Sequence, residues 1–289
     1  MLECLPVHDS EEIAERLEPL FVVARRVLAR RGEETVRAIE RGWYGGPGGE
    51  RVEWGDLVEA ARDAKVSLRP RAPLPVGWSR RFPVTRVQVR NETTLAAARR
   101  LAEEGRRPLA LNFANGFTPG GGFLAGARAQ EESLCRASAL WATLAGDEMY
   151  EHHRRRARPD STDWAILSPE VPVFREDDGT PLAEPWLLDF LTCAAPVAHR
   201  LEPGEAAELL RARIHRVLAI ARAYGVDTLV LGAWGCGAFG NDPATTARDF
   251  RAALEGPFDG VFELVIFAIA DTRPSRPTLG PFAEVFGPP

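Results

Sequence analysis

Residues 111–122 read LNFANGFTPGGG and residues 130–132 read QEE, and these two stretches decide how the chain is interpreted. The first begins as an apolar strand and runs into a polar turn that ends in three consecutive glycines. Because glycine has no side chain, a ligand can lie directly against the backbone there. After a seven-residue spacer, two adjacent carboxylates stand where an amphipathic helix is expected to begin. A glycine loop beside paired acids predicts a site that binds a polar ligand and transfers a proton.

Strands and helices alternate from residue 84 onward, which predicts a layered α/β domain. Strands are expected at 84–89, 108–113, 164–168, 186–194, 228–231 and 262–270, and helices at 93–104, 131–144, 206–224 and 244–254. Residues 1–80 are expected to be helical, within 13–40 and 57–64, with a proline-rich connector at 70–83. The Pro/Gly-rich C-terminal tail is expected to be surface coil. The predicted division is a helical extension over 1–83 and a core over 84–289.

Composition and charge argue against several classes of protein. The formal net charge is −5, so bulk electrostatics do not attract nucleic acid or other polyanions. The four cysteines are widely spaced, which indicates neither a disulfide framework nor a zinc site. His152 and His153 stand in a charged run that is expected to be a solvated helix face. The sequence has no apolar stretch of signal or membrane length near its start, so we expect a reduced, cytoplasmic protein.

Two asparagines, Asn112 and Asn115, stand at the carboxyl end of the strand that leads into the glycines. Ligands bind at this end of the strands in open α/β sheets. The asparagine amide offers both a donor and an acceptor, which suits sugar hydroxyls. Asparagines are also common in turns, and taken alone the pattern favours that structural role.

The acids Glu131 and Glu132 would stand in the first turn of their helix, where carboxylates often only complement the helix dipole. Carboxylates confined together raise each other's pKa, and a held proton is what the acid of a glycoside-cleaving enzyme needs. The helix N-terminus opposes this effect because it favours the ionised form. Adjacent helical residues point about 100° apart. We therefore expect the two acids to divide their roles and not to flank one bond as the usual glycosidase pair does.

A second glycine-rich loop lies within residues 229–243, which read LVLGAWGCGAFGNDP. An apolar strand enters this loop, and a helix is expected to follow with Asp242 as its N-cap and Pro243 at its first position. This order of elements surrounds phosphates with backbone N–H groups. Phe239 is expected either to cover a base or ribose or to pack in the core. Cys236 has no histidine at a suggestive spacing, so we expect a small residue in a tight turn and not a nucleophile.

The same loop contains G-x-G-x-x-G at positions 235, 237 and 240, a pattern found in dinucleotide-binding proteins. The pattern stands near the end of the chain, and no acid-bearing strand end follows convincingly about 20 residues later. A nicotinamide-dependent dehydrogenase would also leave the first glycine loop and the acid pair unexplained. We therefore set that class aside.

The triple glycine, the seven-residue spacer, Gln-Glu-Glu and the later WGCGAFG loop together resemble the poly(ADP-ribose) glycohydrolases of the bacterial type. The resemblance runs from about residue 84 to residue 271. It implies a macrodomain-like three-layer α/β/α fold with a mixed central sheet, and the N-terminal helical extension is consistent with it.

The resemblance also implies roles for the residues that match these motifs. Glu132 would be the catalytic acid and base, Glu131 would bind hydroxyls of the scissile ribose and support Glu132, and Gln130 would help to hold the site. The implied substrate-binding residues are Asn112, Asn115, Gly120, Gly121, Gly122, Gln130, Gly235, Cys236, Gly237, Ala238, Phe239 and Gly240. The first loop would close around the distal ribose and diphosphate, and the second would wrap the diphosphate with Phe239 on the ribose. Animal members carry an aspartate where Asn112 stands, so position 112 would at most position other groups.

The implied reaction is hydrolysis of ribose–ribose O-glycosidic bonds in poly(ADP-ribose), from chain ends, with release of ADP-ribose and without metal or cofactor. Residues 1–80 are a candidate wall that would restrict cleavage to ends. Two other readings stay open: a macrodomain hydrolase that removes single ADP-ribose groups from protein or nucleic acid, and a non-catalytic ADP-ribose reader. A reader has no need of the acid pair. We expect a monomer that acts on the polymer and on ADP-ribosylated proteins in the DNA damage response, without direct nucleic-acid or membrane binding.

Overall fold

The computed structural model describes residues 1–75, 82–158 and 160–288, and their strands form one large mixed sheet. In this part of the chain the sheet has eight strands in the order β1-β5-β10-β9-β6-β8-β7-β4. In this order, the first six strands, β1, β5, β10, β9, β6 and β8, all run parallel to one another. Strand β7 runs antiparallel to both β8 and β4. The bounds are β1 (Leu2–Cys4), β4 (Val66–Leu68), β5 (Thr85–Arg90), β6 (Leu109–Phe113), β7 (Ala165–Arg175), β8 (Pro181–Cys193), β9 (Thr228–Leu231) and β10 (Leu264–Ala268).

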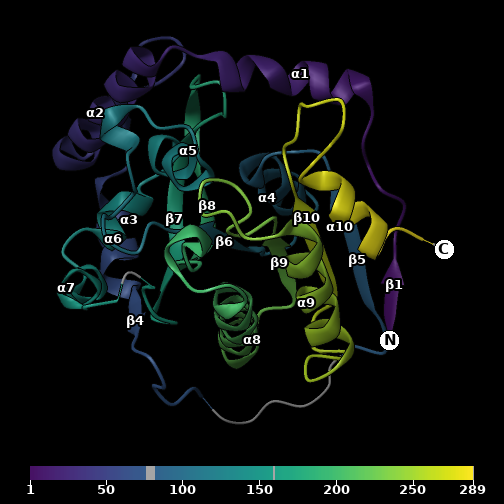
Figure 1. Ribbon diagram of the computed structural model, residues 1–289. Helices are drawn as coiled ribbons and strands as arrows, with labels where there is room; N and C mark the ends of the chain where they lie inside the picture. Colours follow the sequence, from purple (N-terminus) through teal and green to yellow (C-terminus); the bar gives the residue numbers. More distant parts are fainter. Residues whose placement is uncertain (76–81, 159, 289) are drawn as a thin grey trace.

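Helices cover both faces of this sheet (Figure 1). One layer contains α2 (Arg25–Arg41), α3 (Gly55–Ala64), α4 (Thr94–Glu103), α5 (Gln130–Ala137), α6 (Leu140–Leu144) and α7 (Glu148–Arg155). The other contains α8 (Glu205–Ala223), α9 (Pro243–Glu255) and α10 (Leu279–Phe286). The predicted three-layer α/β/α fold with a mixed sheet is therefore confirmed. Within the described residues, no helix is both long enough and apolar enough to cross a membrane.

Alternation along the central strands explains the two layers. In β6, Leu109 and Leu111 pack in the core beneath α8, α9 and α10, whereas Ala110 packs in the core on the opposite face. Successive strand residues point to opposite faces, so a strand buried on both sides reads as a continuous apolar run. The predicted start of α9 is confirmed as well, because the Asp242 side chain accepts a hydrogen bond from the N–H of Thr245 at 2.7 Å.

Two predicted helices are interrupted in the structure. The helix expected over 131–144 divides into α5 and α6 because Ser138 is extended and forms a β-bridge with Val173. The helical region expected over 13–40 divides at Val23 and Ala24, which are also extended, into α1 (Glu11–Val22) and α2. The spacing of apolar residues predicts a helix across each stretch. It carries no information about the contact or turn that interrupts the helix.

The C-terminal tail differs from the coil that was expected, because residues Leu279–Phe286 form α10. Leu279, Phe282 and Phe286 are buried on one face of this helix. Their spacing of three and four residues is typical of an amphipathic helix. The prolines and glycines of the tail favoured coil, and this spacing was therefore not recognised as helical.

The N-terminal region contains strands as well as the predicted helices. β1 and β4 are the outermost strands of the central sheet, and β2 (Trp43–Gly45) pairs with β3 (Arg51–Glu53) in a separate ribbon. Each has three residues, too few for an alternation to be recognised in the sequence. A domain division near residue 83 stays a prediction, and residues 76–81 of the expected connector lie outside the described residues.

Candidate active site

The side chain of Gln130 fixes the start of α5 against the end of β6. Its Oε1 accepts a hydrogen bond from the N–H of Phe113 at 2.9 Å. Its Nε2 donates to the carbonyl oxygen of Leu111 at 2.8 Å and to Oγ1 of Thr94, in the first turn of α4, at 3.1 Å. One amide group therefore sets the helix that carries the acid pair relative to the sheet.

Glu131 is buried at the start of α5, with 1% of its surface exposed. Its Oε2 accepts a hydrogen bond from the N–H of Asn115 at 2.7 Å, and Asn112 Nδ2 donates to its Oε1 at 3.4 Å. Burial raises the pKa of Glu131 to about 8, and the hydrogen bond from Asn115 opposes this shift without cancelling it. Glu131 therefore keeps its proton at neutral pH, and burial outweighs the effects that favour its ionised form.

Glu132 is also buried and is held by the glycine loop. Its Oε1 accepts a hydrogen bond from the N–H of Gly122 at 2.9 Å. Its Oε2 is buried and has no hydrogen-bond partner among the described residues, and the same is true of Oδ1 of Asn112. Buried polar atoms are nearly always paired in native proteins. Two unpaired acceptors next to a glycine loop therefore indicate a place where a ligand supplies the missing donors.

The triple glycine is in close contact with the acids. Gly120 and Gly121 adopt φ angles of +70° and +56°, in the left-handed region that favours glycine. A Cβ atom on Gly121 would lie 2.4 Å from Glu132 Oε1 and 3.0 Å from Glu131 Oε2. Any side chain at this position would therefore displace the acid pair. The two motifs that the sequence separates by seven residues form one site.

The turn between β6 and the glycines is shaped by Asn115. Its Oδ1 accepts hydrogen bonds from the N–H groups of Phe117 at 2.8 Å and Thr118 at 3.0 Å. This is the local pattern by which asparagine stabilises turns. The side-chain oxygen of Asn115 therefore shapes the turn while its backbone N–H holds Glu131.

His153 supports the same turn from α7, a role that the sequence did not suggest. Its Nδ1 lies 2.8 Å from the carbonyl oxygen of Gly116, and its Nε2 lies 2.7 Å from Oγ1 of Thr162. Burial lowers the pKa of His153 to about 4, so the ring is neutral. The expectation of a solvated face is wrong for His153 and holds for His152, which is exposed. The burial of Met149 and Tyr150, on the same helix face, explains the difference.

The second glycine loop is organised by Asn241, which sequence reasoning missed. Its Nδ2 donates to the carbonyl oxygens of Gly235 at 3.1 Å and Pro196 at 2.8 Å. A Cβ atom on Gly235, where φ is +78°, would lie 2.6 Å from this nitrogen. Burial raises the pKa of Cys236 to about 11, so its thiol is protonated, in agreement with a structural role.

A cavity of about 350 Å³ extends from the start of α5 to the second glycine loop. Its described wall includes Gln130 and Phe113 together with Gly235, Gly237, Ala238 and Phe239 of the second glycine loop. The acid pair and the triple glycine are not part of this wall and adjoin it through Gln130. Cavities of this size bind small ligands and cofactors. Among the described residues, no group of three or more His, Cys, Asp or Glu is arranged to hold a metal ion.

A macrodomain-like fold with a carboxylate pair against one glycine loop and a second glycine loop across a cavity defines a class of macrodomain-like hydrolases. Residues 32–176 match the family described as microbial-type PARG, catalytic domain. The chain belongs to this poly(ADP-ribose) glycohydrolase family, as the motifs predicted, and is a glycohydrolase. The matched range begins within α2, upstream of the residue at which the resemblance was expected to start.

Solved structures agree with this assignment. The crystal structure of poly(ADP-ribose) glycohydrolase from Thermomonospora curvata is 43% identical, with 90% of this chain and 100% of that chain covered and a TM-score of 0.84. A structure of the same enzyme bound to the inhibitor ADP-HPD is 45% identical at the same coverage and TM-score. The enzyme from Deinococcus radiodurans in complex with ADP-ribose is 40% identical, with 80% and 89% of the two chains covered and a TM-score of 0.66. No curated protein matches the chain significantly.

Proposed function

We propose that this protein hydrolyses the ribose–ribose O-glycosidic bonds of poly(ADP-ribose) and releases ADP-ribose. The observation that carries the proposal is the arrangement of the acid pair. Glu131 is buried and protonated at neutral pH, and Glu132 beside it keeps one oxygen without a protein partner. A reader of ADP-ribose has no use for a buried pair of acids, whereas glycoside hydrolysis needs a proton donor and a base.

In the proposed mechanism, Glu132 transfers a proton to the 2′ oxygen of the leaving ribose. The bond between that oxygen and C1″ breaks through an oxocarbenium-like transition state. Glu132, now a carboxylate, takes a proton from a water molecule whose oxygen attacks C1″, and the acid is regenerated. Protonated Glu131 binds the ribose hydroxyls and places no second negative charge beside Glu132. Asn112, through its unpaired Oδ1, positions the sugar.

The second glycine loop binds the diphosphate in this proposal. The loop lies directly before α9, whose start is already capped by the Asp242 carboxylate, so it is the backbone N–H groups of the glycine loop that favour an anion. Phe239 lines the same cavity, and its carbonyl oxygen accepts a hydrogen bond from the N–H of Ala198 at 2.8 Å. This fixed backbone supports its role as a cover for the distal ribose.

We further propose that cleavage is confined to chain ends. Leu20 and Phe21 of α1 and Leu28 and Arg31 of α2 line the cavity, so the first helices close one side of it. A polymer can then enter only with its terminal unit. Long oligomers as early products would contradict this part of the proposal.

The sequence and its family resemblance also lead us to propose a cytoplasmic monomer that acts on ADP-ribosylated proteins in the DNA damage response.

The test follows free ADP-ribose released from poly(ADP-ribose) by the wild type and by Glu132→Gln, with ADP-ribose affinity measured for both by calorimetry. We expect release by the wild type, loss of release by a factor of about 10³ or more in the variant, and similar affinity. If neither protein releases product while both bind, the activity proposed here is wrong. Mono-ADP-ribosylated proteins and nucleic acids are then the substrates to test, and a reader would retain binding with no hydrolysis of any of them.

A further inference from the structure

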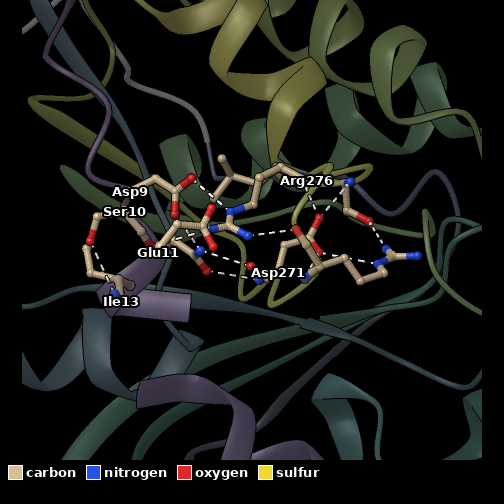
Figure 2. A network of polar contacts seen from close by, with 10 residues as sticks. Asp9, Ser10, Glu11, Ile13, Asp271 and Arg276 are labelled. Carbon is tan, nitrogen blue, oxygen red and sulfur yellow. Dashed lines mark hydrogen bonds and ion pairs between the residues drawn. The ribbon is translucent and has the colours of Figure 1, made fainter. Parts of the chain in front are cut away.

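Arg276 joins the start of α1 to the C-terminal part of the core (Figure 2). Its Nε donates to Asp9 Oδ2 at 2.9 Å, and its Nη2 donates to the carbonyl oxygen of Ser10 at 3.2 Å and to Glu11 Oε1 at 3.3 Å. Its Nη1 donates to the carbonyl oxygen of Arg273 at 2.7 Å. The side chain is only 9% exposed, so these charge-assisted bonds are partly shielded from water.

The same network extends to the ends of two central strands. Asn91, directly after β5, donates from Nδ2 to Asp9 Oδ1 at 2.7 Å and to the carbonyl oxygen of Asp271 at 2.9 Å. Oδ2 of Asp271, which follows β10, accepts the N–H groups of Thr278 at 2.8 Å and Leu279 at 3.2 Å at the start of α10. The latch, defined as Asp9, Asn91, Asp271 and Arg276, therefore ties α1 to β5, β10 and α10.

Beyond the latch, α1 has little support of its own. Of its twelve residues, all of which the structure describes, only Ala14 is buried. The chain is fixed again just after the other end of α1. There Arg128 donates to the carbonyl oxygen of Val23 at 2.8 Å, and Arg25, the first residue of α2, donates to the carbonyl oxygen of Ala125 at 2.7 Å. Figure 1 shows α1 as a nearly straight helix that crosses the top of the molecule between these two ends.

We propose that Arg276 is a positioning residue for substrate binding. By holding Asp9 and Glu11, it sets α1 so that Leu20 and Phe21 form the cavity wall against the terminal nucleoside of the substrate. Both side chains line the cavity, and Phe21 is 38% exposed, which leaves its ring accessible to a flat apolar partner such as a nucleobase. This inference rests on the proposed function because the cavity is taken to hold ADP-ribose.

The experiment compares Arg276→Gln and Arg276→Lys with Arg273→Gln. Arg273 stands in the same loop, its side chain is 63% exposed, and its own bonds are to Asp271 and Thr278 and not to α1. Arg273→Gln therefore matches the change in charge and touches the latch only at Asp271, while the bonds from Arg276 to Asp9 and Glu11 stay in place. Position 276 has φ +44°, a strain that arginine, lysine and glutamine share. The readouts are the dissociation constant of ADP-ribose, and KM and kcat for release of ADP-ribose from the polymer.

We expect Arg276→Gln to raise the dissociation constant and KM about tenfold, the usual effect of losing a charged hydrogen bond. kcat should stay near the wild-type value because the acid pair is untouched. Arg276→Lys should recover part of the loss, and Arg273→Gln should behave as the wild type. Unchanged affinity in Arg276→Gln, or a loss confined to kcat, would overturn the inference.

A second variant covers the case in which Arg276→Gln does not fold. Phe21→Ala leaves the latch intact and removes an exposed side chain, so it should fold and should still raise the dissociation constant of ADP-ribose. Unchanged affinity in Phe21→Ala overturns the inference on its own. Failure of the proposed function has a different signature, since the wild type would then release no ADP-ribose from the polymer whatever the latch variants bind.

Discussion

The acidity of Glu131 is set by the residues that surround it. Cys135 and Tyr150 lie near it, and burial raises the pKa of both, so they stay neutral. Within the part of the chain that the structure describes, no cation is among the main groups that act on Glu131, and any negative charge on Glu132 raises its pKa further. An apolar and uncharged environment is the usual way in which proteins keep a carboxylic acid protonated at neutral pH.

The stability of the protein should therefore depend on Glu131 between about pH 4.5 and about pH 8. In this window the folded state holds a proton that the unfolded chain has lost, so the free energy of unfolding falls as the pH rises. Glu131→Gln removes this effect. The melting temperature of the variant minus that of the wild type should therefore increase as the pH is raised from 5 to 8. Thermal melts at several pH values test this. Glu184→Gln, at an exposed position on β8, is the control, and parallel curves for Glu131→Gln and wild type would contradict the prediction.

At the scale of elements, α2 supports the segment between the triple glycine and the acid pair. Gly32 faces η1 (Phe123–Ala125), and a Cβ atom on it would lie 2.8 Å from the carbonyl oxygen of Phe123 and 3.2 Å from its ring. Three residues later on α2, Thr35 Oγ1 donates to the carbonyl oxygen of Arg136 in α5 at 2.8 Å. Helix α2 therefore supports both η1 and α5, which carries the acid pair.

Gly32→Ala should lower kcat about tenfold, because a misplacement of catalytic groups by a fraction of an ångström is costly. The added methyl group pushes η1 and, through it, the glycine loop. In an unstrained helix the same change gains about 1 kcal/mol of stability. Gly280→Ala in α10 is the matched control, since its Cβ would meet Arg276 Cβ at an ordinary 3.8 Å. Wild-type kcat in Gly32→Ala would mean that α2 does not position the loop.

The parts of the fold and site that the sequence predicted are those that depend on local signals. The strand ending at Phe113, the glycine loop and the acids at the start of α5 are adjacent in sequence, so turn chemistry and helix periodicity predict them. The break at Ser138 depends on pairing with Val173, and the proton on Glu131 depends on burial by segments far along the chain. The support from His153 depends equally on distant packing. Contacts of this kind have no signal in a short window of sequence.

At the scale of the whole molecule, α10 completes one of the two cores. The rings of Phe282 and Phe286 lie 5.3 Å and 4.7 Å from that of Phe267 on β10, measured between centroids. All three side chains are fully buried. The acid pair belongs to the opposite helix layer, so this core supports the acid pair through the sheet.

Phe282→Ala should lower the free energy of unfolding by about 3–5 kcal/mol, because it removes a buried ring and leaves a cavity. Release of ADP-ribose at temperatures well below the melting point should be retained, since α5 and its loop are on the other face. Urea denaturation measures the loss, and Leu187→Ala, at a side chain that is 42% exposed, is the control. A loss below 1 kcal/mol would mean that α10 is not needed to cover the sheet.

The placement of β1 and β4 as the outermost strands has a consequence for how the chain avoids self-association. Strands with free backbone donors and acceptors along one side can pair with other chains and start aggregation. Because β1 and β4 have only three residues each, they present short rows of such groups. A chain without its first 68 residues would uncover β5 and the eleven-residue β7 instead. The N-terminal region that lines the cavity therefore also protects the sheet from pairing with neighbouring molecules in a crowded cell.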